Sequence, residues 1–433
     1  MKDLVEKATE RTQCPYYIAR QMVQRGGANV IFCPYNYLMS PSTRNAMGLD
    51  SKIQGSVVII DEAHNIEDVA RDAASCELSL SRVIKLRSEI QVFEKHQALV
   101  SFVSSFTGWY EGLCQESTVV LGGPESVVLL HENTGLSTEM LDTLTTSLKS
   151  KDDEEEGLPP SIVSVLDELF GVFNFILSDG GVHARDFKVV VRPNGKGDHQ
   201  LCFWCLNAAV AFKALADCCR SIVLASGTLA PLNSFAHELG VAFNHKLEAP
   251  HVVNVQQQVF SRVVAYENRV KLEATFSNQK SEEYVDALGR CMLKYCKEIP
   301  DGTLCFFPSY SFMNSCLNLW KKGDIWKSLN DVKTVFVEGE EPNLDIQMQK
   351  YLEAVAQKGA LFFCVFRGKL AEGIDFKDTA ARAVMICGIP YPNIGDMRIK
   401  LKMEWQASNC QSGDAMNGRT WYNLQAFRAL NQA

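Results

Sequence analysis

The sequence predicts an α/β protein whose parallel sheets are interrupted by a mainly helical insertion, and three observations support this fold class. The apolar run Val57–Ile60 ends directly in Asp61 and Glu62, and open α/β sheets carry their chemistry just beyond such strand ends. Further strand-like runs return after residue 186. Before them, from about residue 80, apolar residues recur at helical spacing with charged residues between them.

The segment on either side of the acidic pair is expected to contain helices and a second strand. Cys14-Pro15-Tyr16-Tyr17 opens a short helical stretch. Residues 29–33 are expected to form a strand that ends at a proline. After the strand Val57–Ile60, residues 65–74 have a helical pattern.

The middle of the chain is expected to be an inserted helical unit followed by strands. Residues 80–106 have helical periodicity, and the pattern resumes through Phe175 after an interruption. That interruption is the acidic run 151–156, closed by Pro159-Pro160, which is expected to be a solvated loop. The strand-like runs expected to rejoin the first sheet are residues 187–191, 201–206 and 221–225.

Composition indicates a protein of two or three domains. The chain has 433 residues and a hydrophobic content of 46%, enough to bury more than one core. Its 15 cysteines, an odd number without regular spacing, favour a reducing compartment, the cytosol or nucleus. No signal peptide or membrane-spanning run is recognised, so no membrane partner is expected. The formal net charge of -8 gives no global basic footprint, so nucleic acid would need a local groove.

The string Asp61-Glu62-Ala63-His64 is the most informative motif of the sequence. An aspartate at a strand end can hold the magnesium of a nucleoside triphosphate, and the adjacent glutamate can polarise the attacking water. These two roles together predict a motor protein that hydrolyses nucleoside triphosphates. The structural alternative is that both acids cap the following helix. The motor is favoured because this four-residue string is rare by chance after an apolar run.

Such motors also need a glycine-rich loop with a lysine, G-x-x-x-x-G-K-[ST], and no such string occurs. Gly26-Gly27 has no lysine after it, and Gly368-Lys369 is followed by leucine. The loop should precede the strand Val57–Ile60, where only a short lead is available. The sequence is therefore expected to be a fragment of a longer protein.

Motifs spread over nearly the whole chain resemble, in the same order, those of one family. The matching strings are Cys14-Pro15-Tyr16-Tyr17, Phe32-Cys33-Pro34-Tyr35-Asn36-Tyr37-Leu38, Ile60-Asp61-Glu62-Ala63-His64-Asn65-Ile66-Glu67-Asp68, Phe203-Trp204-Cys205-Leu206-Asn207, Ala225-Ser226-Gly227-Thr228-Leu229-Ala230-Pro231, Cys305-Phe306-Phe307-Pro308-Ser309-Tyr310, Arg367-Gly368-Lys369-Leu370-Ala371-Glu372-Gly373-Ile374-Asp375-Phe376 and Gly388-Ile389-Pro390-Tyr391-Pro392-Asn393. In these strings the chain resembles the iron–sulfur superfamily 2 DEAH-box DNA helicases.

The resemblance implies two RecA-like parallel-sheet motor lobes with a mainly helical arch insertion in the first. The first lobe would comprise residues 1–79, with a remnant of the iron–sulfur region, and residues 187–245. The arch would comprise residues 80–186, and the second lobe residues 250–433, truncated at its end. In the family, the arch and the cluster domain frame a pore for the translocating strand.

The resemblance also assigns roles in the nucleotide site. Asp61 would position Mg²⁺, Glu62 would orient or deprotonate the attacking water, and His64 would couple the site to the second lobe. Ser226, Gly227 and Thr228 match the motif that transmits nucleotide state to DNA, although such a turn after a strand is also common local punctuation. The residues that match second-lobe positions at the ATP site are Arg367, Glu372, Gly373, Asp375 and Gln432.

The other implied ligands are a cluster and DNA. Cys14 matches the last of four cysteines that hold a 4Fe–4S cluster, and the other three would lie upstream, so this chain alone is not expected to assemble it. Ser309 and Tyr310 match a DNA-binding motif of the second lobe. Tyr35 and Tyr37 could stack on bases, or could be half-buried packing residues.

The leading hypothesis is an ATP-dependent 5′ to 3′ DNA helicase of DNA repair and genome maintenance. ATP, Mg²⁺ and a 4Fe–4S cluster would be its cofactors, single-stranded and forked DNA and repair proteins its partners, and the nucleus its location. An arginine motif expected after Ala433 contributes about a thousandfold or more in rate in such motors, so this polypeptide alone is expected to be nearly inactive. The alternative is a catalytically inactive helicase-like DNA-binding or scaffold protein.

Overall fold

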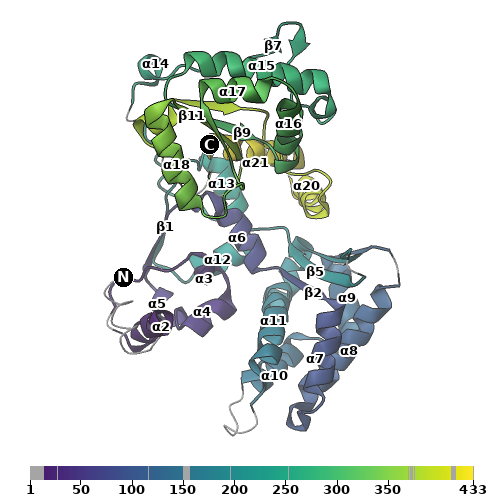
Figure 1. Cartoon of the computed structure of the whole chain (residues 1–433). Helices are drawn as coiled ribbons and strands as arrows, with labels where there is room; N and C mark the ends of the chain where they lie inside the picture. Colours follow the sequence, from purple (N-terminus) through teal and green to yellow (C-terminus); the bar gives the residue numbers. More distant parts are fainter. Residues whose placement is uncertain are drawn as a thin grey trace. The chain divides into compact units, whose positions relative to one another are not determined.

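The structure of the chain is a computed structural model, and it forms two compact units, Met1–Lys246 and Leu247–Ala433. It describes residues 14–26, 28–115, 117–149, 157–195, 197–251, 253–368, 370, 374, 376–410 and 416–432. Figure 1 shows the elements of each unit.

A small parallel sheet in the first unit positions the acidic motif. Its strands are β1 (Val57–Ile60) and β6 (Ser221–Leu224), which lie side by side in register from Val57 opposite Ser221 to Ile60 opposite Leu224. Although the apolar run of β1 is continuous, alternate residues are exposed. Val58 and Ile60 are buried, whereas Val57 and Ile59 are 55% and 70% exposed. The apolar core of this unit covers one face of β1 only, among the described residues.

Helices flank this sheet in the sequence. They are α2 (Pro15–Arg25), α3 (Asn36–Met39), α4 (Pro41–Met47), α5 (Asp50–Ile53), α6 (Ile66–Ala73), α12 (Ala209–Ala216) and α13 (Leu232–Leu239), with the 3-10 turn η1 (Ala63–Asn65) before α6. The predicted helices after Cys14 and at residues 65–74 are confirmed. The predicted strand at residues 29–33 is wrong. Val30 and Phe32 are exposed, and no described strand pairs with this segment.

The helical insertion is confirmed, and it carries its own sheet. Its helices are α7 (Leu80–Ile90), α8 (Gln97–Leu113), α9 (Gly123–Thr134), α10 (Thr138–Lys149) and α11 (Pro160–Gly181), with the 3-10 segments η2 (Glu94–His96) and η3 (Val182–Asp186). The antiparallel sheet has the order β2-β5-β4-β3, with β2 (Cys76–Ser79), β3 (Val119–Gly122), β4 (Phe187–Pro193) and β5 (His199–Cys205).

The prediction that residues 187–191 and 201–206 rejoin the first sheet is therefore wrong. These residues form the hairpin β4–β5, which pairs on one edge with β2 and on the other with β3. The short strands β2 and β3 carry no strong sequence signal, but they supply the backbone partners that the hairpin needs. Only residues 221–224 pair with β1.

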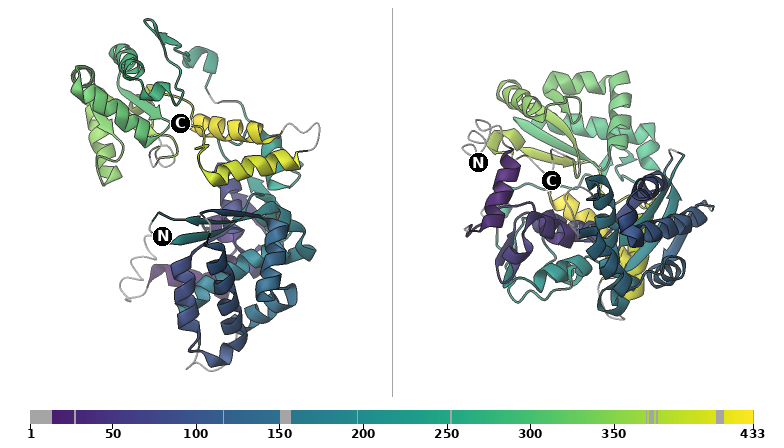
Figure 2. Two further views of the ribbon diagram at one scale, coloured as in Figure 1. Left: turned by 90° about the vertical axis from the view of Figure 1, so that its right-hand side faces the viewer. Right: turned by 90° about the horizontal axis from the view of Figure 1, so that it is seen from below.

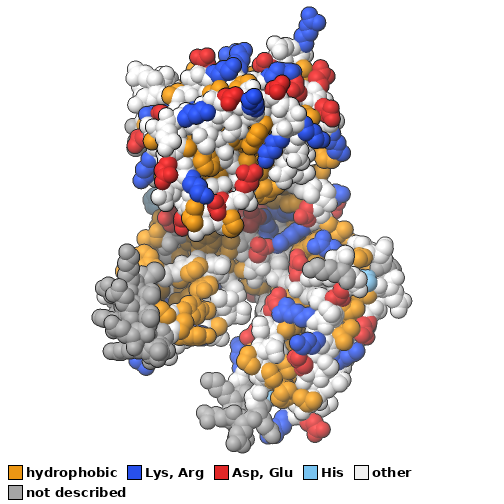
Figure 3. Space-filling view, in the orientation of Figure 1, with side chains coloured by type: hydrophobic (Ala, Val, Ile, Leu, Met, Phe, Trp, Pro, Cys, Tyr) orange, Lys and Arg blue, Asp and Glu red, His pale blue; other side chains and the backbone are white. Residues whose placement is uncertain are grey.

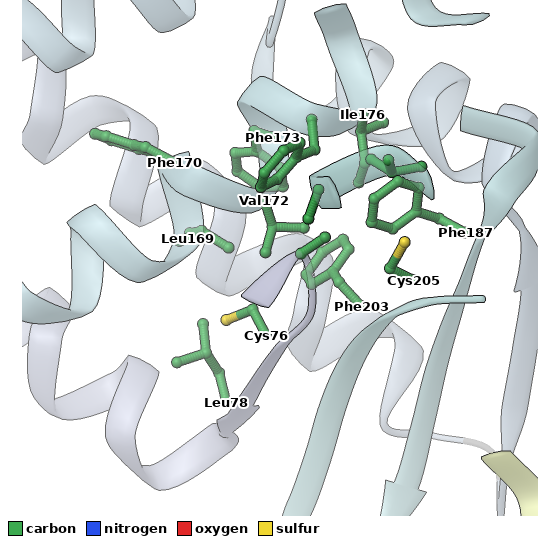
Figure 4. Close-up of a cluster of buried hydrophobic side chains, with 14 of the residues drawn as sticks. Cys76, Leu78, Leu169, Phe170, Val172, Phe173, Ile176, Phe187, Phe203 and Cys205 are labelled. Carbon is green, nitrogen blue, oxygen red and sulfur yellow. The ribbon is translucent and has the colours of Figure 1, made fainter. Parts of the chain in front are cut away.

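Aromatic side chains from α11 fill the core between the helices and this sheet (Figure 4). Phe173 on α11 is fully buried and meets Phe203 of β5 edge to face, with 5.5 Å between ring centroids. By length and composition the stretch Pro160–Asp186 could cross a bilayer, contrary to the expectation from sequence. Its buried residues instead pack in the protein core, which is how a long apolar helix of a globular unit behaves.

The second unit is built on a four-stranded parallel sheet of order β10-β11-β9-β12, as the α/β prediction requires. Its strands are β9 (Gly302–Phe307), β10 (Thr334–Val337), β11 (Ala360–Val365) and β12 (Ala383–Ile386). Alternate residues of β9 and β11 enter two separate apolar cores. The sheet is therefore covered on both faces, the usual situation of central parallel strands.

Helices from both sides complete this unit. One core contains residues of α15 (Glu282–Glu298), α16 (Tyr310–Lys322) and α17 (Ile325–Val332), and the other contains residues of α18 (Leu344–Gln357). Two further helices, α20 (Met397–Asn409) and α21 (Gly418–Gln432), lie side by side (Figure 2). The remaining elements are α14 (Val255–Gln258), the hairpin β7 (Tyr266–Glu267) and β8 (Val270–Lys271), η4 (Asn278–Lys280) and η5 (Asp378–Ala381).

Candidate functional site

The ends of β1 and β6 bring two loops of the first unit together. Parallel pairing continues past the strands, because Ile60 O accepts the Ala225 N–H at 2.9 Å and Ala225 O accepts the Ala63 N–H at 3.0 Å. Residues 61–64 and 226–228 therefore leave the same edge of the sheet. The register explains why motifs more than 160 positions apart in the sequence meet here.

Glu62 has a left-handed backbone conformation, with φ 49° and ψ 44°. Such a conformation costs a non-glycine residue about 1–3 kcal/mol and is concentrated at functional positions. The Glu62 N–H donates to Asp61 Oδ1 at 3.0 Å, which ties the two acids together. Neither η1 nor α6 has a side-chain cap hydrogen bond, so the acids do not act here as the helix caps of the structural alternative.

A three-residue cluster joins the two loops. Ser226 Oγ donates to Glu62 Oε2 at 3.0 Å, His64 Nδ1 lies 3.0 Å from Ser226 Oγ, and His64 Nδ1 lies 3.2 Å from Glu62 Oε2. The serine hydroxyl has one proton, so while it donates to Glu62 it can accept a hydrogen bond from the ring nitrogen. The cluster thus connects the carboxylate of one loop to the serine of the other.

The Ser226-Gly227-Thr228 loop also forms a hydrogen bond within itself. Ser226 Oγ also accepts the Thr228 N–H at 3.4 Å, as in a serine turn. Gly227 is exposed. The same hydroxyl takes part in the turn and in the contact with Glu62. The geometry is therefore compatible with both interpretations of the sequence, a local turn and a loop linked to the nucleotide site.

Two kinds of inorganic ligand are relevant to the donor groups of this unit, a magnesium ion and an iron–sulfur cluster. Asp61 is exposed at the strand end, and Mg²⁺ is commonly held by one or two carboxylates together with substrate phosphates and water, so this residue fits. Cys14 is exposed at the start of α2. Within the described ranges no group of three or more metal-binding side chains occurs. The described residues by themselves therefore do not fit a four-cysteine cluster.

The aromatic candidates of the first unit are partly buried. Tyr35 and Tyr37 pack against its apolar core. A hydrogen bond with Tyr37 raises the pKa of Tyr16. These positions favour the packing alternative for both tyrosines, although their edges remain accessible.

A groove of about 740 Å³ lies where α11 faces helices α4 and α12. Its lining includes Lys149 and Lys213, but also Asp50, Asp167 and Asp217. Burial raises the pKa of Asp167. The mixture of charges does not provide the uniformly basic lining that a phosphate backbone favours.

The candidate residues of the second unit lie beyond the ends of its strands. Ser309 caps α16, because its Oγ accepts the Phe312 N–H at 3.2 Å, and Tyr310 beside it is 46% exposed. Arg367 follows β11 with φ 60°, and its guanidinium donates to Gln425 O of α21 at 3.1 Å. Gln432 lies at the end of α21. The predicted residues Glu372, Gly373 and Asp375 are outside the described residues.

Sequence reasoning missed Glu338, the acid that follows β10. Its side chain is buried and contacts the loop that contains Arg367. The available signal was the same as for Asp61, an apolar run that ends in a carboxylate. Without a matched string, one glutamate at a strand end is not distinctive.

Comparisons with known proteins place these observations among helicases. A family model described as DEAD_2 matches residues 1–83, and one described as Helicase C-terminal domain matches residues 292–433. The Fanconi anemia group J protein homolog of Gallus gallus is 34% identical over 501 residues, covering 100% of this chain and 39% of the relative. The Regulator of telomere elongation helicase 1 homolog of Anopheles gambiae is 30% identical over 509 residues, covering 100% and 50%.

The chain thus spans half or less of the length of these curated relatives. Residues 332–335 and 425–433 resemble the Fanconi anaemia group J helicase more than the telomere helicase. The identity over the whole chain is likewise higher with the first relative, at 34%, than with the second, at 30%. A solved structure titled XPD_Helicase has a TM-score of 0.51 at 21% identity, covering 100% of this chain and 71% of that chain. This likeness confirms the predicted α/β fold of RecA-like type.

Proposed function

Since this chain belongs to the iron–sulfur superfamily 2 DEAH-box helicases, we propose that its protein is an ATP-dependent 5′ to 3′ DNA helicase of DNA repair and genome maintenance. The observation that carries the proposal is the contact of Glu62 with Ser226 and His64. A motor must link the hydrolysis site to the DNA site, and this cluster links the two loops that would do so. The names of the relatives support a role in the nucleus.

In the proposed mechanism Glu62 orients the attacking water and accepts its proton, and Asp61 would hold Mg²⁺. The ion would supply charge neutralisation for phosphoryl transfer. Both contacts of Glu62 use Oε2, and protonation of the carboxylate during hydrolysis would remove its charge and so weaken the hydrogen bonds with Ser226 and His64. Hydrolysis would therefore alter the position of the 226–228 loop.

Single-stranded DNA would contact a limited set of side chains. Tyr310 is exposed at the start of α16 and suits base stacking, with Ser309 beside it. Tyr35 and Tyr37 would contribute through their accessible edges. On the face shown in Figure 3, basic and acidic side chains are interspersed, which supports local rather than global attraction of DNA.

The proposal includes the family's organisation and remaining ligands. Residues 1–79 and 187–245 would form the first lobe, residues 80–186 the arch, and residues 250–433 the second lobe. Cys14 would bind a 4Fe–4S cluster together with three further cysteines. Arg367, Glu372, Gly373, Asp375 and Gln432 would face ATP, and forked DNA and repair proteins would be the partners.

The test uses the protein at the length set by its native transcript, whose ends are mapped first. We expect ATP hydrolysis stimulated by single-stranded DNA, and separation of forks that carry a 5′ tail but not a 3′ tail. Intact mass of the endogenous protein checks the length. DNA binding without ATP hydrolysis would contradict the proposal and favour the scaffold alternative.

Replacing Ser226 by alanine is expected to weaken coupling between hydrolysis and strand separation. The change removes the donor to Glu62 and leaves the charge of the carboxylate intact. Fork separation per ATP hydrolysed should fall about tenfold, the scale of a coupling of 1–3 kcal/mol. Ser221→Ala, on β6 but without a contact to Glu62, is the matched control. Equal yields of separated strands per ATP in wild type and Ser226→Ala would contradict this role.

A further inference from the structure

Glu338 is a buried carboxylate at the end of β10, with 7% of its surface exposed. No lysine or arginine pairs with it in the part of the chain that the structure describes. A buried carboxylate is costly unless other donors satisfy it. Its position therefore requires compensation from nearby hydrogen-bond donors.

The donors are Val365, the last residue of β11, and Leu370, five positions later. The Val365 N–H donates to Glu338 Oε2 at 2.9 Å, and the Leu370 N–H donates to Glu338 Oε1 at 3.4 Å. Each carboxylate oxygen therefore accepts one backbone hydrogen bond. Arg367 lies between these two donors in the sequence and has a left-handed conformation.

Gly368 shows how closely the carboxylate approaches the loop. A Cβ atom at this position would lie 2.5 Å from Glu338 Oε1 and 2.8 Å from Glu338 Oε2. A side chain could not be accommodated without moving the carboxylate or the loop. The absence of a side chain at Gly368 therefore allows the Glu338 carboxylate to lie this close to the backbone.

Glu338 also lies beside the start of α16. Both Glu338 and Tyr310 line a groove of about 510 Å³ together with Asn314, Lys321 and Glu340. Burial and the nearby Glu338 carboxylate raise the pKa of Tyr310. The side chain of Tyr310 is 46% exposed, which leaves its ring accessible to a base.

We propose that Glu338 is a positioning residue that couples the DNA contact at Tyr310 to the nucleotide-facing loop at Arg367. Its carboxylate accepts hydrogen bonds from the Val365 and Leu370 N–H groups and lines the same groove as Tyr310, and these segments belong to separate strings of the sequence. A displacement of Tyr310 by a stacked base would be transmitted through the carboxylate to the Val365 and Leu370 amides. The inference rests on the proposed function.

Glu338→Gln tests this role in the protein at its native length. Glutamine has nearly the same size but presents an amide NH₂ in place of one acceptor oxygen, so one of the two loop N–H groups loses its partner. We expect the stimulation of ATP hydrolysis by a single-stranded oligonucleotide to fall about tenfold, within the usual range of coupling between sites. Glu283→Gln, an exposed acid on α15 that does not line this groove, should retain the wild-type stimulation ratio.

Two further variants separate coupling from stability. In a cycle of Tyr310→Phe and Glu338→Gln, residues that act through one another give a double variant whose stimulation is no lower than that of the worse single variant. Gly368→Ala disturbs the same contact from the loop side and should also reduce stimulation. The proposal would be overturned if the two single variants lowered the stimulation additively in the double variant and if each loss were proportional to the fall in melting temperature.

Hydrogen exchange makes the outcome independent of catalysis. Adding a single-stranded oligonucleotide should slow exchange of the Val365 and Leu370 amides in the wild type but not in Glu338→Gln, with the oligonucleotide bound to both. If this difference in exchange were seen in a protein without ATPase activity, the proposed helicase function would be refuted, but the proposed coupling through Glu338 would stand. Equal protection and equal stimulation in wild type and variant would refute the coupling.

Discussion

Replacing Glu62 by glutamine is expected to abolish DNA-stimulated ATP hydrolysis, lowering kcat by about 100-fold to 10,000-fold, the usual contribution of a general base. Glutamine keeps the size of the side chain and can still accept the hydrogen bond from Ser226, but it cannot take a proton from water. The left-handed backbone at this position is equally available to both residues. Steady-state hydrolysis with saturating single-stranded DNA measures the effect.

Binding measurements distinguish a catalytic role for Glu62 from a structural one. Nucleotide affinity and DNA affinity should remain within about twofold of the wild type, because binding and the chemical step are separable. Glu132→Gln, an exposed acid on α9, is the matched control and should hydrolyse ATP normally. Retained hydrolysis in Glu62→Gln would remove this residue from the proposed mechanism.

Phe173→Ala is expected to cause the largest loss of stability, about 3–5 kcal/mol in the free energy of unfolding. The ring is fully buried and packs against Phe102, Phe106 and Phe203, so its removal leaves a cavity among aromatic side chains that cannot all move inward. Chemical denaturation followed by circular dichroism measures the loss.

The loss should be confined to the first unit, because Phe173 belongs to an apolar core that contains only residues of that unit. Amides of β9 and β11 should keep their hydrogen-exchange protection. Val128→Ala, at a side chain that is 55% exposed, should change stability by less than about 0.5 kcal/mol. A similarly small loss in Phe173→Ala would show that this core can collapse around the missing ring.

The helices were more predictable from sequence than the pairing of strands. Helical periodicity is local, and the insertion from α7 to α11 was anticipated from it. An apolar run such as residues 201–206 indicates a strand but not its neighbour, since the neighbour is chosen by contacts distant in sequence. Residues 29–33 have strand-like composition but no described partner, which is why the expectation failed there.

The motifs of the candidate site could be predicted from the sequence, but the contacts between them could not. The strings around Asp61 and Ser226 were each recognisable, but their meeting depends on the register of β1 with β6. Glu338 was not recognisable, since its importance comes from the backbone N–H groups it receives rather than from its neighbours in sequence. Backbone donors have no signature in a sequence.

The pairing of β2 with β5 has a consequence for how this protein can evolve. Cys76 lies opposite Phe203, and the Cys205 N–H donates to Ser75 Oγ at 2.9 Å, so the chain departs and returns at adjacent points. Segments joined in this way can lengthen, shorten or be exchanged without altering the distance between their attachment points. Length differences among relatives are therefore expected to accumulate between residues 80 and 186, while the spacing from Asp61 to the start of β2 stays constant.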